Sequence, residues 1–153
     1  MAKKTDWPKP DKYRVAVKAG FAAMRLLGLS FVEQARMFSK SATTKEELRK
    51  IERNLAETKF QNMDILDRSK YLVEIHKLAL RKHGSALTVA RWVHKKERGV
   101  SPVDLLTTGH LHHVVMVLLW LQKLNGIPQD PKLVDFVDIV EEILARRISI
   151  ARS

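Results

Sequence analysis

Cysteine is absent from the sequence, which excludes a disulfide framework and any zinc site built on thiolates. We expect no cleaved secretory signal, because residues 1–18 are charged and interrupted by proline where such a signal needs an apolar stretch. Long apolar runs are also lacking: the longest, Val114 to Leu121, spans about 12 Å as a helix, against about 30 Å of hydrocarbon in a bilayer. We therefore expect a cytoplasmic protein that does not bind a membrane.

Familiar catalytic motifs are missing as well. The sequence has no glycine-rich phosphate loop, no Ser-x-x-Lys pair and no Gly-x-Ser-x-Gly elbow. Its isolated aspartates and glutamates fall mostly on the polar faces of the helices that we expect. We therefore predict that the protein is not an enzyme and that it needs no cofactor.

Positive charge is what the chain has in excess, and it is distributed unevenly. Lysine and arginine number 28 against 17 acidic residues, which gives a net charge of +11. Residues 1–50 carry +7, residues 51–100 carry +5 and residues 101–153 carry −1. A basic surface can displace counterions from a polyphosphate, so the asymmetry favours nucleic-acid binding by the first two thirds and protein contacts by the last third. A merely solvated basic surface is the alternative.

Apolar residues recur at helical spacing along the chain, and no segment alternates with the period of two that is typical of strands. Ser30 stands three residues before a glutamate, as in a capping box, and Gly84 follows a long helical pattern as a C-cap. We expect Val15 to face inward in the first helix and another helix to run from Ser85 to near Gly99. The predicted fold is all-α: a compact bundle of about six or seven helices with an N-terminal helix-turn-helix-like region.

Composition divides the chain into three parts. Residues 1–10 hold two prolines in a lysine-rich stretch and are predicted to be an irregular N-terminal arm. Residues 11–60 are predicted to form a basic helix-turn-helix-like region. Residues 61–153 are predicted to form a helical core for partner binding and dimerisation.

Two short helices are expected on either side of residues 40–42, with the dimensions of a helix-turn-helix. In such a motif the N-terminal end of the second helix enters the major groove of DNA. Basic side chains there can neutralise phosphates, and hydroxyls can reach phosphate oxygens or base edges. The predicted DNA-contact residues are Lys40, Ser41, Thr43, Thr44, Lys45, Arg49 and Lys50.

Six histidines raise the question of a metal site. His110 and His113 have the spacing to face one cation from a helix, but no acid lies near them in the sequence to complete a set of three ligands. A helix start rich in histidine is more typical of a polar surface or a partner contact, so we predict no metal. The predicted partner-contact residues are Trp92, His94, His110, His113, Arg146 and Arg147. For the two arginines, the alternative is that they complement the dipole at a helix C-terminus.

Residues 78–126 carry glycines, a tryptophan and a Pro-x-Asp-Leu-Leu segment in a distinctive order. In chain order these residues are Gly84, Ala90, Trp92, His94, Gly99, Pro102, Asp104, Leu105, Leu106, Thr108 and Gly126. The stretch resembles the toxin-binding domain of the Xre/MbcA/ParS antitoxin family, in which an alanine- and tryptophan-bearing helix precedes a Gly-x-x-Pro-x-Asp-Leu-Leu segment. Members of that family also have a helix-turn-helix region upstream, which residues 18–51 resemble.

This resemblance implies the antitoxin of a type II toxin–antitoxin system. Such a protein is a homodimer that represses transcription from its own promoter and neutralises its cognate protein toxin by steric blockage. The toxin would be an enzyme that consumes NAD or transfers ADP-ribose, and residues 61–153 would bind it. Two alternatives stay open: a stand-alone DNA- or RNA-binding regulator of phage or plasmid origin, and a helical oligomeric interaction module.

Overall fold

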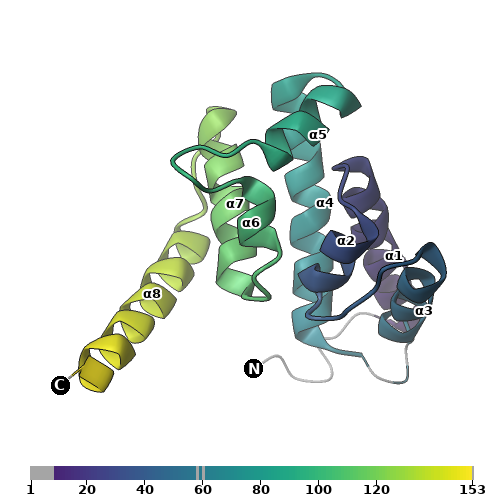
Figure 1. The fold of residues 1–153 in the computed structure, drawn as a ribbon, viewed down its shortest axis with the longest axis horizontal. Helices are drawn as coiled ribbons and strands as arrows, with labels where there is room; N and C mark the ends of the chain where they lie inside the picture. The colour runs from purple at the N-terminus through teal and green to yellow at the C-terminus, as the bar shows by residue number, and fades with distance from the viewer. Residues whose placement is uncertain (1–8, 58, 60, 153) are drawn as a thin grey trace.

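The computed structural model describes residues 9–57, 59 and 61–152, within which the chain forms eight helices (Figure 1). In chain order the helices are α1 (Pro10–Leu26), α2 (Phe31–Met37), α3 (Lys45–Leu55), α4 (Met63–His83), α5 (Ala86–His94), α6 (Pro102–Leu106), α7 (Leu111–Leu124) and α8 (Pro131–Arg152). The prediction of an all-α bundle is confirmed, although the described residues form eight helices where about six or seven were expected. Most of the predicted N-terminal arm, residues 1–10, lies outside the described residues.

Capping residues set the starts of several helices. The Ser30 hydroxyl accepts a hydrogen bond from the Glu33 backbone N–H, and the Glu33 carboxylate accepts one from the Ser30 N–H. Ser101 and Asp104 form the same reciprocal pair at the start of α6. A cap of this kind stabilises a helix by about 1 kcal/mol. At the C-terminal end of α4, Gly84 adopts the left-handed conformation predicted for a C-cap, with a φ of 82°.

Helix α4 lies at the centre of the bundle, with α1 on one side and α7 on the other (Figure 1). The close approach of α1 to α4 depends on Gly20, because a Cβ at this position would lie 2.8 Å from the Ser69 Cα. Phe21 of α1 stacks on Phe38 with 5.0 Å between ring centroids, and both rings belong to the main apolar core. Full burial of such a side chain contributes about 1.5–3 kcal/mol to the stability of the fold. The main apolar core therefore holds the shorter helices in place on α1 and α4.

Helix α8 packs on α7 through a second, smaller apolar cluster in which Val115, Leu119 and Val137 are buried. Beyond that contact α8 extends away from the bundle (Figure 1), and its Ile139 and Ile143 are 57% and 46% exposed. The helix therefore has apolar surface that the rest of the described chain does not cover. No helix among the residues described has both the length and the apolar character needed to span a bilayer.

The prediction that Val15 faces inward is wrong, because this side chain is 66% exposed. Helix α1 turns a different stripe toward the core, which includes Tyr13, Val17 and Phe21. These residues recur at intervals of four, whereas Val15 lies two positions away from two of them and points to another side of the helix.

The helix expected from Ser85 to near Gly99 is shorter than predicted, since α5 ends at His94. Lys95 is extended, and Arg98 and Gly99 both have positive φ, in a turn that is closed by backbone hydrogen bonds between residues 97 and 100. A left-handed residue cannot continue an α-helix, so the basic segment after α5 becomes an exposed loop.

Candidate nucleic-acid interface

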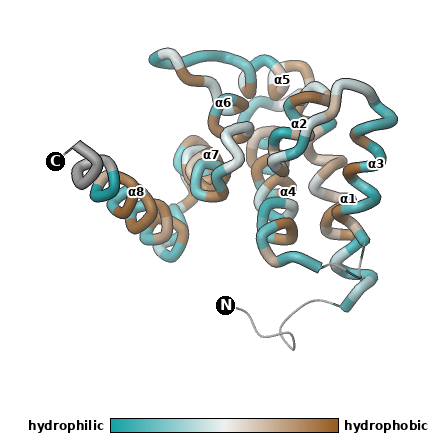
Figure 2. Tube along the Cα trace, turned by 60° about the horizontal axis from the view of Figure 1, so that its bottom comes forward, coloured by the Kyte–Doolittle hydropathy of each residue, from teal (hydrophilic) through white to brown (hydrophobic). Residues whose placement is uncertain are grey.

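Helices α2 and α3 pack against each other at one edge of the molecule (Figures 1 and 2). Leu48 is the buried residue of α3, and the rest of this helix is largely hydrophilic. All seven predicted DNA-contact residues are exposed, namely Lys40, Ser41, Thr43, Thr44, Lys45, Arg49 and Lys50. The structure therefore leaves this predicted face accessible.

Four of these side chains are cations that lack an ion pair within the part of the chain that the structure describes: Lys40 before α3, and Lys45, Arg49 and Lys50 on α3. Lys45 and Arg49 border a cleft of about 430 Å³ between α1, α2 and α3. In the same cleft Arg25 pairs with Glu52 at 3.5 Å. Solvated cations of this kind can neutralise phosphates along a nucleic-acid backbone.

The hydroxyls of Thr43 and Thr44 are engaged within the protein. Each donates a hydrogen bond to Oε1 of Glu47 at 3.2 Å, and Thr44 also accepts one from the Glu47 backbone N–H. These bonds cap α3 and fix its first turn. Because the two hydroxyls already have partners, the basic side chains are the better candidates for phosphate contacts.

The connection between α2 and α3, residues 38–44, is longer than the turn of about three or four residues in a helix-turn-helix. Ser39 has a left-handed φ of 59°, and Ala42 is buried. Helix α3 is positioned by its packing on α1 and α2, and the Tyr13 hydroxyl donates a hydrogen bond to the Leu55 carbonyl at 3.1 Å. The helix pair is thus held by tertiary contacts, and its identity as a helix-turn-helix stays a prediction.

Sequence reasoning missed Arg68, a buried cation in α4 whose side chain is 8% exposed. Its Nη1 donates to the Met37 carbonyl at 3.1 Å and its Nη2 to the Gly109 carbonyl at 2.8 Å, while Nε pairs with Asp64 at 2.8 Å. The guanidinium therefore ties the end of α2 and the loop before α7 to the central helix. Only the spacing of Asp64 and Arg68, four residues apart, was visible in the sequence as a sign of pairing.

Among the predicted partner-contact residues, Trp92 lies in the core with 8% exposure. Its ring centroid is 5.2 Å from that of His83 and 6.0 Å from that of Trp120. An indole this deeply packed offers little area to a partner. The structure therefore gives Trp92 a packing role that joins α4, α5 and α7.

His94 is exposed at the end of α5 and contacts α2. Its Nε2 lies 3.0 Å from a carboxylate oxygen of Glu33, and its Nδ1 lies 2.9 Å from the Ala90 carbonyl oxygen. Burial lowers the pKa of His94, but the hydrogen bonds to Ala90 and Glu33 more than offset this effect, so the pKa lies above its usual value. His94 thus links the end of α5 to α2, the helix that precedes α3.

His110 and His113 lie at the start of α7, where His110 is exposed and His113 is half-buried. The His113 Nδ1 is 2.7 Å from the Thr108 hydroxyl. Burial lowers the pKa of His113, and the neighbouring His112 and His110 lower it further. The fold also brings Glu141 of α8 to this group, an acid that the neighbouring sequence does not supply.

Arg146 and Arg147 are both exposed on α8. Arg146 donates a hydrogen bond to Glu142 at 2.6 Å, one turn earlier in the helix. A pair of this type contributes about 0.3–0.5 kcal/mol to a helix. Both arginines lie more than one turn before the end of α8 at Arg152, so the helix dipole acts on them only weakly.

Comparison with models of known protein families, with curated proteins and with solved structures found no match. The resemblance of residues 78–126 to the Xre/MbcA/ParS family therefore stays a prediction from the sequence.

Proposed function

We propose that this chain is the antitoxin of a type II toxin–antitoxin system. It binds its own promoter through the exposed side of α2 and α3, and it covers a toxin that consumes NAD or transfers ADP-ribose with the helices that follow α4. Neutralisation is steric, so the antitoxin itself needs no catalytic residues.

The accessibility of the α3 cations is the observation that carries the DNA-binding part of this proposal. Lys45, Arg49 and Lys50 are exposed and lack ion pairs among the residues described, while the apolar Leu48 between them anchors the helix. A basic helix that is anchored on one side and solvated on the other suits the neutralisation of DNA phosphates.

The contacts between the two halves of the chain support an antitoxin that works as one body. His94 of α5 contacts Glu33 of α2 at 3.0 Å, and Arg68 binds carbonyls from the end of α2 and from the loop before α7. A toxin bound to the later helices would therefore lie on the same rigid unit as the DNA-binding face.

The experiment that tests this proposal expresses the chain with the product of the adjacent gene and with a reporter driven by its own promoter. The α3 triple variant carries K45A, R49A and K50A. The control triple variant removes three exposed lysines elsewhere, with K70A, K123A and K132A. We expect the α3 triple variant to lose repression but still to rescue growth and to co-purify with the toxin, and the control to retain both activities. A wild-type chain that neither represses its promoter nor protects against the neighbouring product would contradict the proposal.

The exposed apolar surface of α8 favours a second candidate function, a helical oligomeric interaction module. Ile139 and Ile143 are 57% and 46% exposed. Exposed apolar side chains that lie close together often mark a surface that a partner covers. The double variant I139E/I143E tests this reading by analytical ultracentrifugation, with V15E as a control because Val15 is 66% exposed on α1. Conversion of a dimer to a monomer by the double variant alone supports the candidate. An unchanged mass excludes it.

A further inference from the structure

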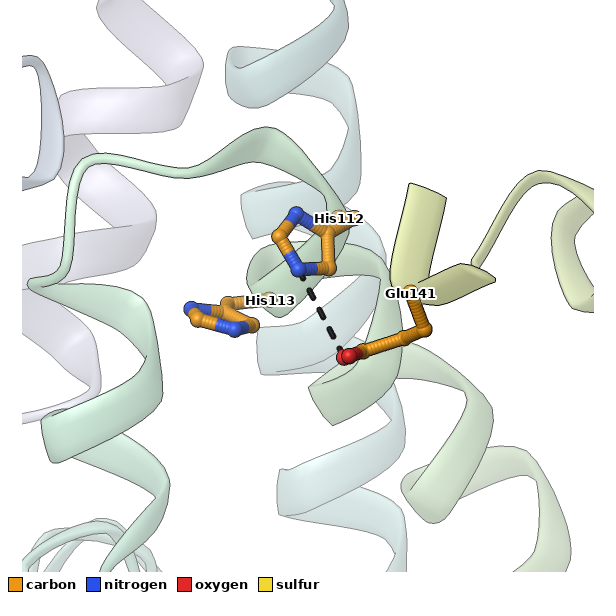
Figure 3. A group of neighbouring side chains, drawn as sticks. All are labelled: His112, His113 and Glu141. Carbon is orange, nitrogen blue, oxygen red and sulfur yellow. Dashed lines mark ion pairs between the residues drawn. The ribbon is translucent and has the colours of Figure 1, made fainter. Parts of the chain in front are cut away.

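Two histidines at the start of α7 and a glutamate from α8 lie close together (Figure 3). His112, His113 and Glu141 each offer one possible ligand atom, and these atoms all lie within 4.8 Å of one another. The acid that the sequence around the histidines lacks is thus provided by a different helix.

His112 is the residue that points most clearly to a ligand. Its side chain is 4% exposed, and its Nε2 is buried without a hydrogen-bond partner. The atom faces Glu141, whose Oε1 is 3.6 Å away, beyond hydrogen-bonding distance (Figure 3). Most buried polar atoms in folded proteins have a partner, and one that lacks a partner costs about 1–3 kcal/mol.

His113 is oriented by a residue outside the group. Thr108 at the end of the preceding loop places its hydroxyl 2.7 Å from the His113 Nδ1. Metal-binding histidines usually have one ring nitrogen held in this way, which fixes the ring and directs the second nitrogen to the metal. Thr108 therefore fixes the orientation of the His113 ring, as the hydrogen-bond partner of a metal-binding histidine does.

We propose that His112, His113 and Glu141 bind a divalent transition-metal ion, for which Zn²⁺ is the best fit. Two imidazole nitrogens and one carboxylate oxygen form a donor set that Zn²⁺ uses in proteins, and the imidazoles make the set less suitable for Mg²⁺ or Ca²⁺, which prefer oxygen. With three protein ligands, the fourth position of a tetrahedral site is taken by water.

The side chains have to draw together slightly to bind the ion. Zinc at about 2.0–2.1 Å from each ligand requires ligand atoms about 3.3 Å apart, against separations of up to 4.8 Å here. Glu141 can make this movement because its side chain is 50% exposed and lies on the surface of α8. The buried His112 then needs little displacement.

Metal binding at this position ties α8 to α7. The apolar cluster between the two helices is small, with Val115, Leu119 and Val137 as its buried members. An ion held by both helices adds a link at the His112 end of α7, so the bound ion stabilises the packed position of α8.

The experiment titrates the full-length, tag-free chain with Zn²⁺ by isothermal calorimetry and with Co²⁺ by visible absorption. We expect one ion for each chain, a Co²⁺ spectrum of tetrahedral type and a higher melting temperature with Zn²⁺. The variants E141Q and H113A should each weaken binding by at least about tenfold, because loss of even an outer partner has an effect of that size. The control E142Q, one residue away on the same helix, should bind as the wild type does.

Two outcomes would overturn the proposal. One is a wild-type chain that binds no Zn²⁺ at micromolar concentration. The other is binding that survives E141Q and is abolished by H110A, which would place the ion on His110 and His113 alone. Because Glu141 and His113 are not in the main core, circular dichroism should show both of their variants to be folded.

Discussion

Arg68 and Met37 are 31 residues apart in sequence, yet the Nη1 of the arginine donates a hydrogen bond of 3.1 Å to the carbonyl at the end of α2. The same guanidinium donates to the Gly109 carbonyl at 2.8 Å. One buried cation therefore holds the helix that precedes α3 and the loop that precedes α7 in fixed positions on α4.

Replacement of Arg68 by methionine should lower the free energy of unfolding by more than about 2 kcal/mol, because hydrogen bonds to a charged group contribute about 1.5–3 kcal/mol each and two carbonyls would lose their donor. Urea denaturation measures this change. The control R81M removes an exposed arginine from the last turn of the same helix and should change stability by less than about 1 kcal/mol. Similar losses in both variants would show that Arg68 does not act as a clamp.

Gly28 should be less tolerant of substitution than Gly99. Both have a φ near 82° or 83°, so alanine at either position is strained by about 1–2 kcal/mol. Only at Gly28 would the new Cβ also meet a neighbour, the Ala90 Cβ at 2.7 Å, whereas Gly99 has open space. We expect thermal unfolding to show G28A as less stable than G99A by about 1–3 kcal/mol, the usual effect of overpacking. Equal melting temperatures for G28A and G99A would mean that α5 does not pack closely against the turn at Gly28.

The contact between His94 and Glu33 should make stability depend on pH. The pKa of His94 is raised in the folded protein. The stability that the protonated His94 contributes is therefore fully present below the usual histidine pKa of about 6.5, and it is lost as the pH rises through the pKa of the folded state. The pKa of Glu33 is lowered: burial raises it, but hydrogen bonds from Ser30 and His94 lower it more. Its contribution is therefore complete above the usual value of 4.5 and is lost as the pH falls below that.

The two effects together define a window between about pH 4.5 and 6.5 in which the pair stabilises the fold most. Because the side chains are 41% and 25% exposed, the contribution is about 0.2–1 kcal/mol. Urea denaturation of H94Q at pH 5.5 should show this loss relative to wild type, and the loss should shrink by pH 9. A loss that is the same at both pH values would assign His94 a role in packing instead.

Local chemistry made much of the fold predictable. The caps at Ser30 and Ser101 and the left-handed Gly84 each depend on residues within four positions, so the sequence contains what determines them. The exposure of the predicted DNA-contact residues on α3, namely Lys45, Arg49 and Lys50, likewise follows from a short amphipathic helix with one apolar anchor.

Tertiary contacts account for what the sequence did not reveal. In the sequence, Arg68 looks like an ordinary surface cation on α4. It is buried because the loop before α7 packs over it. Glu141 lies far from His112 in sequence and reaches it only because α8 packs back on α7. Trp92 matches a partner-contact pattern by type, but its burial depends on His83 and Trp120 from other helices. Periodicity along one helix carries no information about such neighbours.

The salt dependence of DNA binding is the most direct test of the claim that α3 contacts the phosphate backbone. Fluorescence anisotropy with a labelled duplex of the chain's own promoter, from about 50 to 300 mM KCl, gives the slope of log K against log salt. This slope is negative, and each phosphate that the protein neutralises adds about 0.9 to its magnitude. We expect the α3 triple variant to reduce the magnitude of the slope by about three and the control triple variant to leave it unchanged. Identical slopes for the wild type and the α3 triple variant would contradict the account.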